Sequence, residues 1–274
     1  MDVKGKTAVV TGGASGIGRG ISRCLASQGM NVVLADIEQS PMDEMVAELA
    51  GAGAAAIGVR TDVSKLDQVE ALAAAALDRF GAVHVLCNNA GVGVPNPVGA
   101  TSMEDWRWTL DIDLWGPIHG VHAFLPIFER QGEGHINSTA SMAGLYAGAS
   151  LGAYNVAKHG VVALMASLER DLRLAGSPVR ASVLCPGPIN TNIVVSERNR
   201  PAESAAQHVD TAAGKKFWDG LTKSLSEGMD PDDVGPMVLD AVVNERFWVL
   251  THPEMASWVT KQNERMVADR SLTR

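Results

Sequence analysis

The amino-acid sequence predicts an α/β fold in which helices cover both faces of a parallel sheet, a doubly wound arrangement. Short apolar runs alternate with amphipathic helical stretches along the whole chain, and a glycine-rich segment directly follows the first run. The apolar runs are mostly uninterrupted by polar residues, which is typical of strands buried on both faces. Such strands, each followed by a helix, form a parallel sheet with right-handed crossovers.

Seven strands and several helices can be placed in order. The strands are expected at 7–10, 32–35, 55–60, 83–87, 135–139, 181–185 and 247–251, and the clearest helices at 17–28, 65–80, 103–129 and 151–174. Neither a linker nor an internal repeat interrupts this order. We therefore predict one domain, residues 1–274, built on a seven-stranded sheet.

Two segments depart from the strand–helix order. Residues 193–228 are polar, helical in patches and longer than an ordinary connection, which predicts a substrate lid, a binding loop or a partly disordered insertion. This insertion is followed by Asp230-Pro231, a helix start with Asp as N-cap and Pro in the first turn. Residues 252–274 are expected to form a C-terminal tail.

Composition excludes several functions. A formal net charge of −8 argues against nucleic acid or an anionic membrane as partner, because both attract a basic face. The three widely spaced cysteines fit reduced thiols, and the start of the chain runs into a strand without a signal peptide, so a cytoplasmic protein is expected. His119 and His122 lie three apart on a helix, but no third ligand accompanies them, and we predict no metal site.

The glycine-rich segment at residues 11–18 predicts a dinucleotide site. Gly12, Gly16 and Gly18 permit a tight turn and a close approach of the backbone to a pyrophosphate. The following helix would present free N–H groups and its dipole to that anion. Glycine clusters are common, but this one stands between the first strand and the first helix, where dinucleotide-binding folds carry it.

Asp36 ends the second strand, eighteen residues beyond Gly18. A carboxylate there can accept hydrogen bonds from the ribose hydroxyls of adenosine and would repel a 2′-phosphate, which predicts NAD as the cofactor. The plainer alternative is a solvated Asp at a strand end. Arg19 leaves NADP open as well, because its cation could serve a 2′-phosphate.

Tyr154 and Lys158 are four apart in a helical stretch and therefore lie on one face. Such a pair alone usually marks a surface. Here Ser141 precedes Tyr154 by thirteen residues and follows a predicted central strand, at the sheet edge where α/β folds bind ligands.

With these motifs together, the sequence resembles the short-chain dehydrogenase/reductase family, in its compact single-domain branch. The matching motifs are Thr11–Gly18, Asp62-Val63, Asn88-Asn89-Ala90-Gly91, Ser141, Tyr154-x-x-x-Lys158 and Pro186–Thr191, in the family's order and spacing. The resemblance implies a Rossmann-type fold and a nicotinamide cofactor. We also expect a homo-oligomer, dimer or tetramer.

The resemblance also assigns cofactor contacts residue by residue. The phosphate turn comprises Gly12, Ser15, Gly16, Ile17 and Gly18; Asp62 and Val63 meet the adenine; Asn89, Ala90 and Gly91 line the end of the fourth strand; Tyr154 and Lys158 reach the nicotinamide ribose; and Pro186, Gly187, Ile189 and Thr191 lie along the nicotinamide. For the Asn88-Asn89 pair, tying the sheet together is the alternative role.

The catalytic prediction follows from acid–base chemistry and the resemblance. A free phenol has a pKa of about 10, too high for a base at neutral pH. Lys158 should lower the pKa of Tyr154, which would then take the hydroxyl proton of an alcohol, while Ser141 binds the substrate oxygen.

Asp113 stands where the family usually carries an Asn, in a pattern like Asn-Leu-x-Gly. In the family, the backbone carbonyl at this place binds a water that links the lysine to solvent. Asp113 is therefore predicted to belong to the catalytic group through its backbone, with a carboxylate that would perturb Lys158.

The expected reaction is the NAD-dependent interconversion of a bulky, hydrophobic and aromatic secondary alcohol with its ketone. Apolar residues of the insertion, Trp218 among them, and of the loop at 92–94 predict an apolar cavity. The insertion's arginines and lysines are expected at a solvated surface, and binding of an anionic substrate is their alternative role. Residues 114–120 and 251–254 are similar to bacterial aryl-alcohol and β-aryl-ether Cα-dehydrogenases. The alternatives are an NADP-dependent ketone reductase, a non-redox reaction such as epimerisation, and a regulatory protein that binds the cofactor without turnover.

Overall fold

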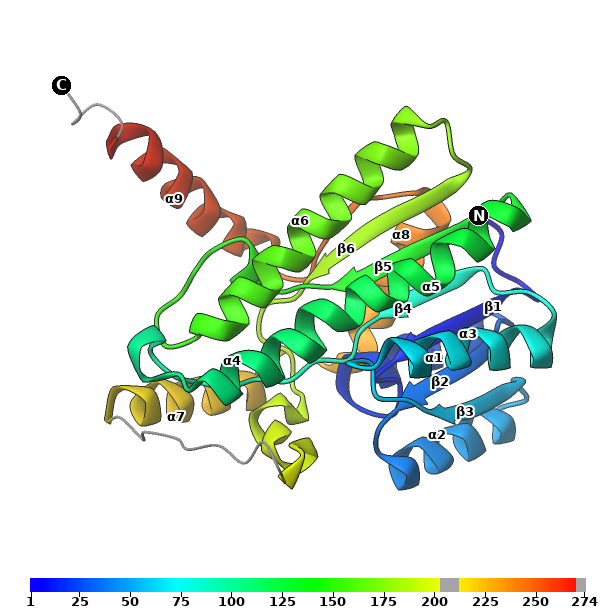
Figure 1. Cartoon of the computed structure of the whole chain (residues 1–274), viewed down its shortest axis with the longest axis horizontal. Helices are drawn as coiled ribbons and strands as arrows, with labels where there is room; N and C mark the ends of the chain where they lie inside the picture. The colour runs from blue at the N-terminus through cyan, green and yellow to red at the C-terminus, as the bar shows by residue number, and fades with distance from the viewer. Residues whose placement is uncertain (203–211, 270–274) are drawn as a thin grey trace.

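The structure is a computed structural model that describes residues 1–202 and 212–269. Residues 203–211 of the predicted insertion and 270–274 of the predicted tail lie outside the described part. Seven strands form one parallel sheet in the order β3-β2-β1-β4-β5-β6-β7 (Figure 1). The strands are β1 (Thr7–Thr11), β2 (Asn31–Asp36), β3 (Ala56–Arg60), β4 (Val85–Asn88), β5 (Gly134–Thr139), β6 (Val179–Cys185) and β7 (Trp248–Leu250).

The predicted fold class is confirmed. Every residue of β1, β4 and β5 is buried, as expected for unalternated apolar runs with helices on both faces. The strand order reverses between β1 and β4, so the loops after these two strands leave toward opposite faces and open a crevice at the carboxyl edge of the sheet.

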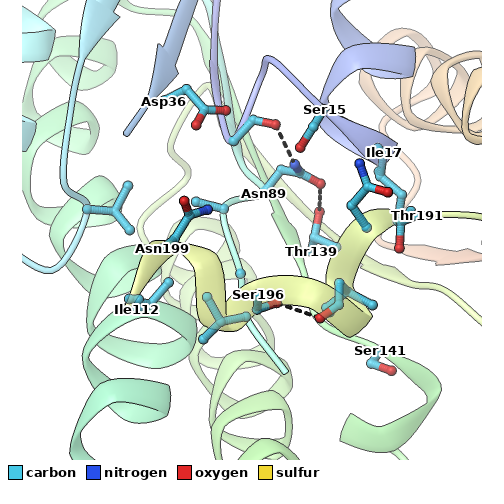
Figure 2. A pocket seen from close by; sticks show the side chains of 18 of the residues that line it. Ser15, Ile17, Asp36, Asn89, Ile112, Thr139, Ser141, Thr191, Ser196 and Asn199 are labelled. Carbon is cyan, nitrogen blue, oxygen red and sulfur yellow. Dashed lines mark hydrogen bonds between the residues drawn. The ribbon is translucent and has the colours of Figure 1, made fainter. Parts of the chain in front are cut away.

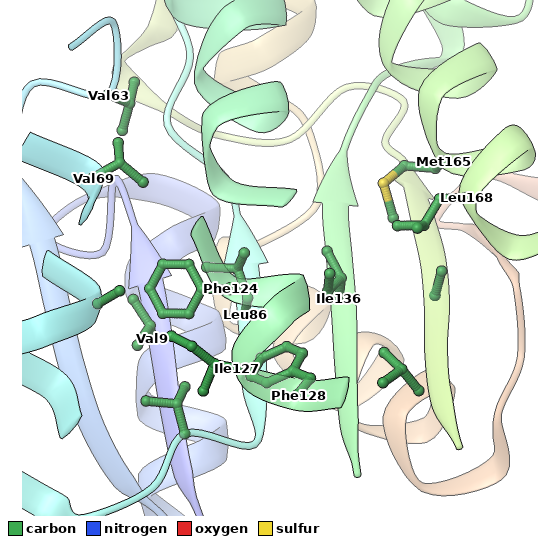
Figure 3. Packing of buried hydrophobic residues seen from close by; sticks show 14 of the residues in the cluster. Val9, Val63, Val69, Leu86, Phe124, Ile127, Phe128, Ile136, Met165 and Leu168 are labelled. Atoms are coloured by element: carbon green, nitrogen blue, oxygen red, sulfur yellow. The ribbon is translucent and has the colours of Figure 1, made fainter. Parts of the chain in front are cut away.

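Helices cover both faces of the sheet. They are α1 (Gly16–Ser27), α2 (Gln39–Gly51), α3 (Leu66–Phe80), α4 (Met103–Leu110), α5 (Gly116–Gln131), α6 (Gly152–Leu174), α7 (Ala212–Ser226), α8 (Val234–Asn244) and α9 (Ala256–Asp269). Figure 3 shows the larger core, in which Phe124 and Phe128 of α5 and Met165 of α6 pack on β1, β4 and β5. On the opposite face, Ile21 and Leu25 of α1 pack with Val238 of α8.

The single helix predicted at 103–129 is wrong in one respect, because a π-helical segment, η2 (Asp111–Trp115), separates α4 from α5. There the N–H of Gly116 donates to the carbonyl of Asp111, five residues earlier. Pro117 follows and has no N–H to donate to the carbonyl of Asp113. The apolar pattern does not reveal this break, because a π-helical turn keeps the chain helical and adds only about one residue to the turn.

The predicted insertion begins with a short helix, η4 (Asn192–Asn199), and ends with α7. Asp230 caps the following turn, η6 (Pro231–Asp233), by accepting a hydrogen bond from the N–H of Asp232 at 2.9 Å, which confirms the predicted helix start. The described part of the tail carries α9, which has no buried residue and extends away from the sheet in Figure 1. No helix of the described residues is long and apolar enough to span a membrane.

Candidate active site

A cleft lies at the carboxyl edge of the sheet, around the ends of β1 and β4, and Figure 2 shows part of its wall. Nearly all of the sequence-predicted site residues meet there. Its lining includes Gly12, Ser15, Gly16, Ile17, Asp36, Asp62, Val63, Asn89, Ala90, Gly91, Ser141, Tyr154, Lys158, Pro186, Gly187, Ile189 and Thr191. Gly18 and Asp113 do not line the cleft and lie directly behind it.

The glycine-rich turn leaves room for backbone and ligand. Gly12 has a φ of +61°, and a Cβ there would lie 2.9 Å from the Cα of Ala90. Gly18 is a packing position, because a Cβ on it would lie 2.0 Å from the carbonyl oxygen of Gly12. Ser15 precedes α1 as its N-cap without a side-chain capping bond, so the N-terminal N–H groups of α1 face the cleft without a competing side chain.

Asp36 lies at the end of β2 and is 8% exposed. Its carboxylate accepts hydrogen bonds at 3.1 Å from the N–H of Ala14 and at 3.1 Å from the N–H of Glu38. Burial raises the pKa of Asp36, although these backbone donors work against the shift. One acid therefore both shapes the glycine-rich turn and lines the cleft.

The two asparagines after β4 differ in role. Asn88 points into the protein, where its amide donates to the hydroxyl of Ser138 at 3.2 Å. Asn89 lines the cleft, donates to the carbonyl of Thr11 at 3.2 Å and accepts from the hydroxyl of Thr139 at 3.2 Å. Both amides tie neighbouring strands together, as the alternative role supposed, and Figure 2 shows the Asn89 contacts.

Ser141, Tyr154 and Lys158 come from two elements. Ser141 follows β5 and caps the short helix η3 (Met142–Gly144), accepting from the N–H of Ala143 at 3.1 Å. Tyr154 and Lys158 lie on the first turns of α6, with the lysine Nζ 5.5 Å from the centre of the tyrosine ring. Lys158 is 3% exposed and donates to the carbonyl of Thr139 at 3.2 Å.

Ser150 lies just before α6 and does not cap this helix. Ser150 has a φ of +59°, and the residue that precedes α6 is Leu151, which has no side-chain capping bond. The turn before α6 is instead held by Asn155, whose amide donates to the carbonyl of Gly148 at 2.7 Å.

The charges around Tyr154 act in opposite directions. Burial is the largest effect and raises the pKa of Tyr154 above its ordinary value, against the expected lowering; Lys158 lowers it, Asp113 raises it again, and a hydrogen bond with Ser141 lowers it. For Lys158, burial favours the neutral amine, but Asp113 and then Tyr154 outweigh it and raise the pKa of Lys158 above its ordinary range. Lys158 is therefore an ammonium at neutral pH.

Asp113 is fully buried on η2, behind the lysine. One carboxylate oxygen lies 3.4 Å from Lys158 Nζ, and the other accepts from the N–H of Val92 at 2.8 Å. The expectation that this side chain would reach Lys158 is met by these distances.

The lining of the cleft also contains apolar side chains, among them Val92, Ile112, Ile193 and Leu225. The proposed cavity residue Trp218 is half-buried on α7 and does not belong to the described lining. Leu225, seven residues and about two turns further along α7, lines the cleft instead. The two residues share one face of the helix, so the helical pattern alone does not show which of them reaches the cleft.

The two arginines of the insertion are engaged with acids. Arg198 pairs with Glu38 at 2.7 Å. Arg200 pairs with Asp105 at 2.6 Å, and its guanidinium stacks on the Trp108 ring at 4.2 Å. The Arg200 side chain is only 3% exposed, so the expectation of a solvated surface is wrong for this residue.

Several lining residues carried no recognisable sequence signal: Ile37, Glu38, Thr61, Thr139, Asn192, Ser196, Arg198, Asn199 and Leu225. Four of them, Ser196, Arg198, Asn199 and Leu225, belong to the insertion, and the first three lie on η4 at the cleft. Ser196 holds η4 at the cleft by accepting from the N–H of Gly93 at 3.2 Å.

In the described ranges, no group of three potential metal-ligating side chains occurs. The ring of His119 lies 2.9 Å from the carbonyl oxygen of Val63.

Known proteins share both sequence and fold with this chain. A family model described as short chain dehydrogenase matches residues 6–202. The 1-deoxy-11-beta-hydroxypentalenate dehydrogenase of Streptomyces avermitilis is 38% identical over 260 residues, which cover 90% of this chain and 95% of the relative.

Two crystal structures match the whole fold. A short-chain dehydrogenase/reductase from Burkholderia phymatum in complex with NAD has a TM-score of 0.96 at 41% identity, covering 98% of this chain and 96% of that one. The apo form of LigO from Sphingobium sp. strain SYK-6 has a TM-score of 0.82 at 33% identity, covering 98% and 90%. With the family model matching most of the chain and the relatives aligning over nearly all of it, this protein is an oxidoreductase that belongs to the short-chain dehydrogenase family.

Proposed function

We propose that the protein is an NAD-dependent dehydrogenase that interconverts a bulky, mostly apolar and aromatic secondary alcohol with its ketone. The observation that carries the proposal is the meeting of Ser141, Tyr154 and Lys158 in one cleft that also contains Asp36. The three side chains would carry out the proton transfer of alcohol oxidation, and the Asp36 carboxylate would favour NAD over NADP.

The cleft fits a dinucleotide. The positive φ values of Gly12 and Gly16 and the uncapped N-terminus of α1 form a cradle for a pyrophosphate, and added Cβ atoms would fill it. Asp62 and Val63 would hold the adenine, while Ile189 and Thr191 would border the nicotinamide. When bound, the nicotinamide would supply the hydride acceptor for oxidation.

NAD is preferred over NADP in this proposal because two acids lie at the end of β2. Asp36 retains unshared electron pairs on both oxygens for the ribose hydroxyls. Arg198, a cation in the lining of the cleft, is already paired with Glu38. The NAD complex of the Burkholderia phymatum enzyme supports the same choice.

Tyr154 would act as the base that takes the alcohol proton. The Lys158 ammonium lies near its ring and stabilises the phenolate, while the Ser141 hydroxyl would donate to the substrate oxygen as charge develops. The Asp113 carbonyl, which Pro117 cannot bond, would hold a water that returns the lysine's proton to solvent.

The substrate class is inferred from the apolar side chains in the cleft and from the arginines of the insertion, which are paired with acids. Val92, Ile112, Ile193 and Leu225 favour a large carbon skeleton. Because Arg198 and Arg200 are both engaged with carboxylates, neither is available to bind an anionic substrate. A Streptomyces avermitilis relative is named for a hydroxylated substrate, which supports oxidation at a hydroxyl-bearing carbon.

The test is a panel of secondary alcohols with NAD and with NADP, followed through the absorbance of the reduced cofactor. Aryl carbinols with NAD should be turned over far better than 2-propanol. Tyr154→Phe should bind NAD as the wild type does and lose nearly all turnover, because the ring remains and the proton acceptor is gone. Equal activity on 2-propanol and an aryl carbinol would reject the substrate class, and an active Phe variant would remove Tyr154 from the chemistry.

A further inference from the structure

Asp113 and Lys158 form an ion pair that is almost completely buried, at a position where the family usually carries an Asn. The Asp113 side chain is 0% exposed and that of Lys158 4%, and 3.4 Å separates the carboxylate from the ammonium. Lys158 also lines the cleft, whereas Asp113 does not. Gly91 closes the space beside the pair, because a Cβ on it would lie 3.4 Å from Lys158 Nζ and 3.5 Å from the Asp113 carboxylate.

Burial raises the pKa of Asp113, while the Lys158 ammonium and the Val92 N–H work against this shift and favour the ionised carboxylate. One oxygen accepts from the Val92 N–H at 2.8 Å; the other lies 3.4 Å from the Lys158 ammonium and has no hydrogen-bond partner among the described residues, so no acceptor lies beside it. A protonated carboxyl would need such an acceptor for its own O–H. Asn at this place would present only one acceptor oxygen to the two donors.

We propose that Asp113 is a positioning residue that acts through Lys158: its carboxylate holds the ammonium in place and partly cancels the positive charge that Tyr154 senses. The proposal rests on the proposed roles of Tyr154 and Lys158. It differs from a backbone relay, because it assigns a task to the side chain that replaces the family's usual Asn.

Three titratable groups surround Lys158 among the described residues: Asp113 on η2, Tyr154 on α6 and Cys185 at the end of β6. Burial raises the pKa of Cys185 to about 12, so this thiol stays neutral over the working range. The charge that reaches Tyr154 is therefore governed by the Asp113–Lys158 pair. As a consequence, Tyr154 should ionise at a higher pH than it would beside an unpaired lysine.

The chain allows a direct measurement, because it contains two tyrosines only, Tyr146 and Tyr154. In a Tyr146→Phe background, the ultraviolet absorbance of tyrosinate against pH reports Tyr154 alone. Asp113→Asn in this background should lower the titration midpoint by about one pH unit or more, since an unpaired neighbouring cation shifts a pKa by about 1–3 units.

Two control variants are measured in the same titration. Asp111→Asn removes an exposed carboxylate from the same π-helical segment and should leave the midpoint unchanged. The Tyr146→Phe/Tyr154→Phe variant should show no tyrosinate transition. An unchanged or raised midpoint in Asp113→Asn would overturn the proposal.

Thermal unfolding provides the second measurement if Asp113→Asn folds poorly. Removing one partner leaves a buried, unpaired ammonium, so Asp113→Asn combined with Lys158→Met should be more stable than Asp113→Asn alone. Additive losses of stability would contradict the pairing. Neither measurement needs a substrate, so the role of Asp113 can be tested separately from the proposed reaction.

Discussion

Asp36 illustrates how one side chain can combine a structural and a binding contact. Its carboxylate fixes the glycine-rich turn through the N–H of Ala14 while facing the cleft. Substitution at this position therefore acts on cofactor choice and on the turn together, and two variants are needed to separate the effects.

Asp36→Ala should raise KM for NAD by about tenfold or more, since hydrogen bonds to a charged group contribute about 1.5–3 kcal/mol. Use of NADP should improve, because the repulsion of a 2′-phosphate disappears. Asp36→Asn retains an acceptor oxygen for one backbone N–H and should show the gain in NADP use with a smaller loss of melting temperature. Steady-state kinetics with both cofactors and thermal melts make the comparison. A wild type that already prefers NADP would refute the role of Asp36.

His135 makes stability depend on pH. It is 1% exposed on β5, its Nε2 lies 2.8 Å from the Ser182 hydroxyl, and burial lowers its pKa from 6.5 to about 4. Between these values the unfolded chain binds the proton and the folded chain does not. The stabilisation is therefore fully present above pH 6.5 and is lost as pH falls toward 4, by about 3 kcal/mol in total.

Urea unfolding between pH 4 and 7 should show this loss, and His135→Gln, which keeps a polar group for Ser182, should flatten the dependence. An equally steep dependence in the Gln variant would assign it to other groups.

At the level of secondary-structure elements, close helix packing supports the phosphate cradle. A Cβ on Gly20 of α1 would lie 2.1 Å from the carbonyl oxygen of Pro231, and one on Gly235 of α8 would lie 2.5 Å from Cys24 Cβ. The N-terminal turn of α1 thus depends on contacts with η6 and α8, more than two hundred positions later in the chain.

Gly20→Ala should destabilise the protein by roughly 1–3 kcal/mol through overpacking and weaken NAD binding, because α1 must move away from η6. Gly220→Ala is the matched control: it lies within α7, has nothing within 4 Å of its Cβ position, and should stabilise by up to about 1 kcal/mol. Denaturant unfolding and NAD titration test both variants. If Gly20→Ala equalled the wild type in both, the packing argument would fail.

At the scale of the whole molecule, α9 contacts the rest of the protein near its start, where the Trp258 ring centre lies 5.9 Å from the Tyr146 ring centre and Val259 packs against the core. This helix of 14 residues exposes Trp258, Met266 and Val267 and buries no residue. Helices of this length are marginal alone in water, and exposed apolar groups of this size usually meet a partner. The expected homo-oligomer would supply one, with a second copy of the chain against α9.

Light scattering should therefore give a mass above that of one chain, and truncation after Met255 should reduce it while the remaining fold still melts cooperatively. Lys261→Ala, which removes a charge from the same helix, should leave the mass unchanged. A monomeric full-length chain would contradict the expectation.

The sequence by itself determined the fold class and most of the cleft. Buried parallel strands are recognisable from local apolar runs, and their carboxyl ends converge whatever the intervening loops contain. Residues placed directly after strands, such as Gly12, Asp36, Asn89 and Ser141, therefore reach the site for topological reasons. The helical spacing of Tyr154 and Lys158 is equally local.

Only the tertiary structure decided which distant side chains meet. The contact of Asp113 with Lys158 depends on a π-helical turn that apolar spacing does not reveal. The pairing of Arg198 with Glu38 and the choice of Leu225 over Trp218 depend on how the insertion packs at the cleft. Ion pairs and cavity walls arise from packing between elements, and local periodicity carries no information about the rotation of one element against another.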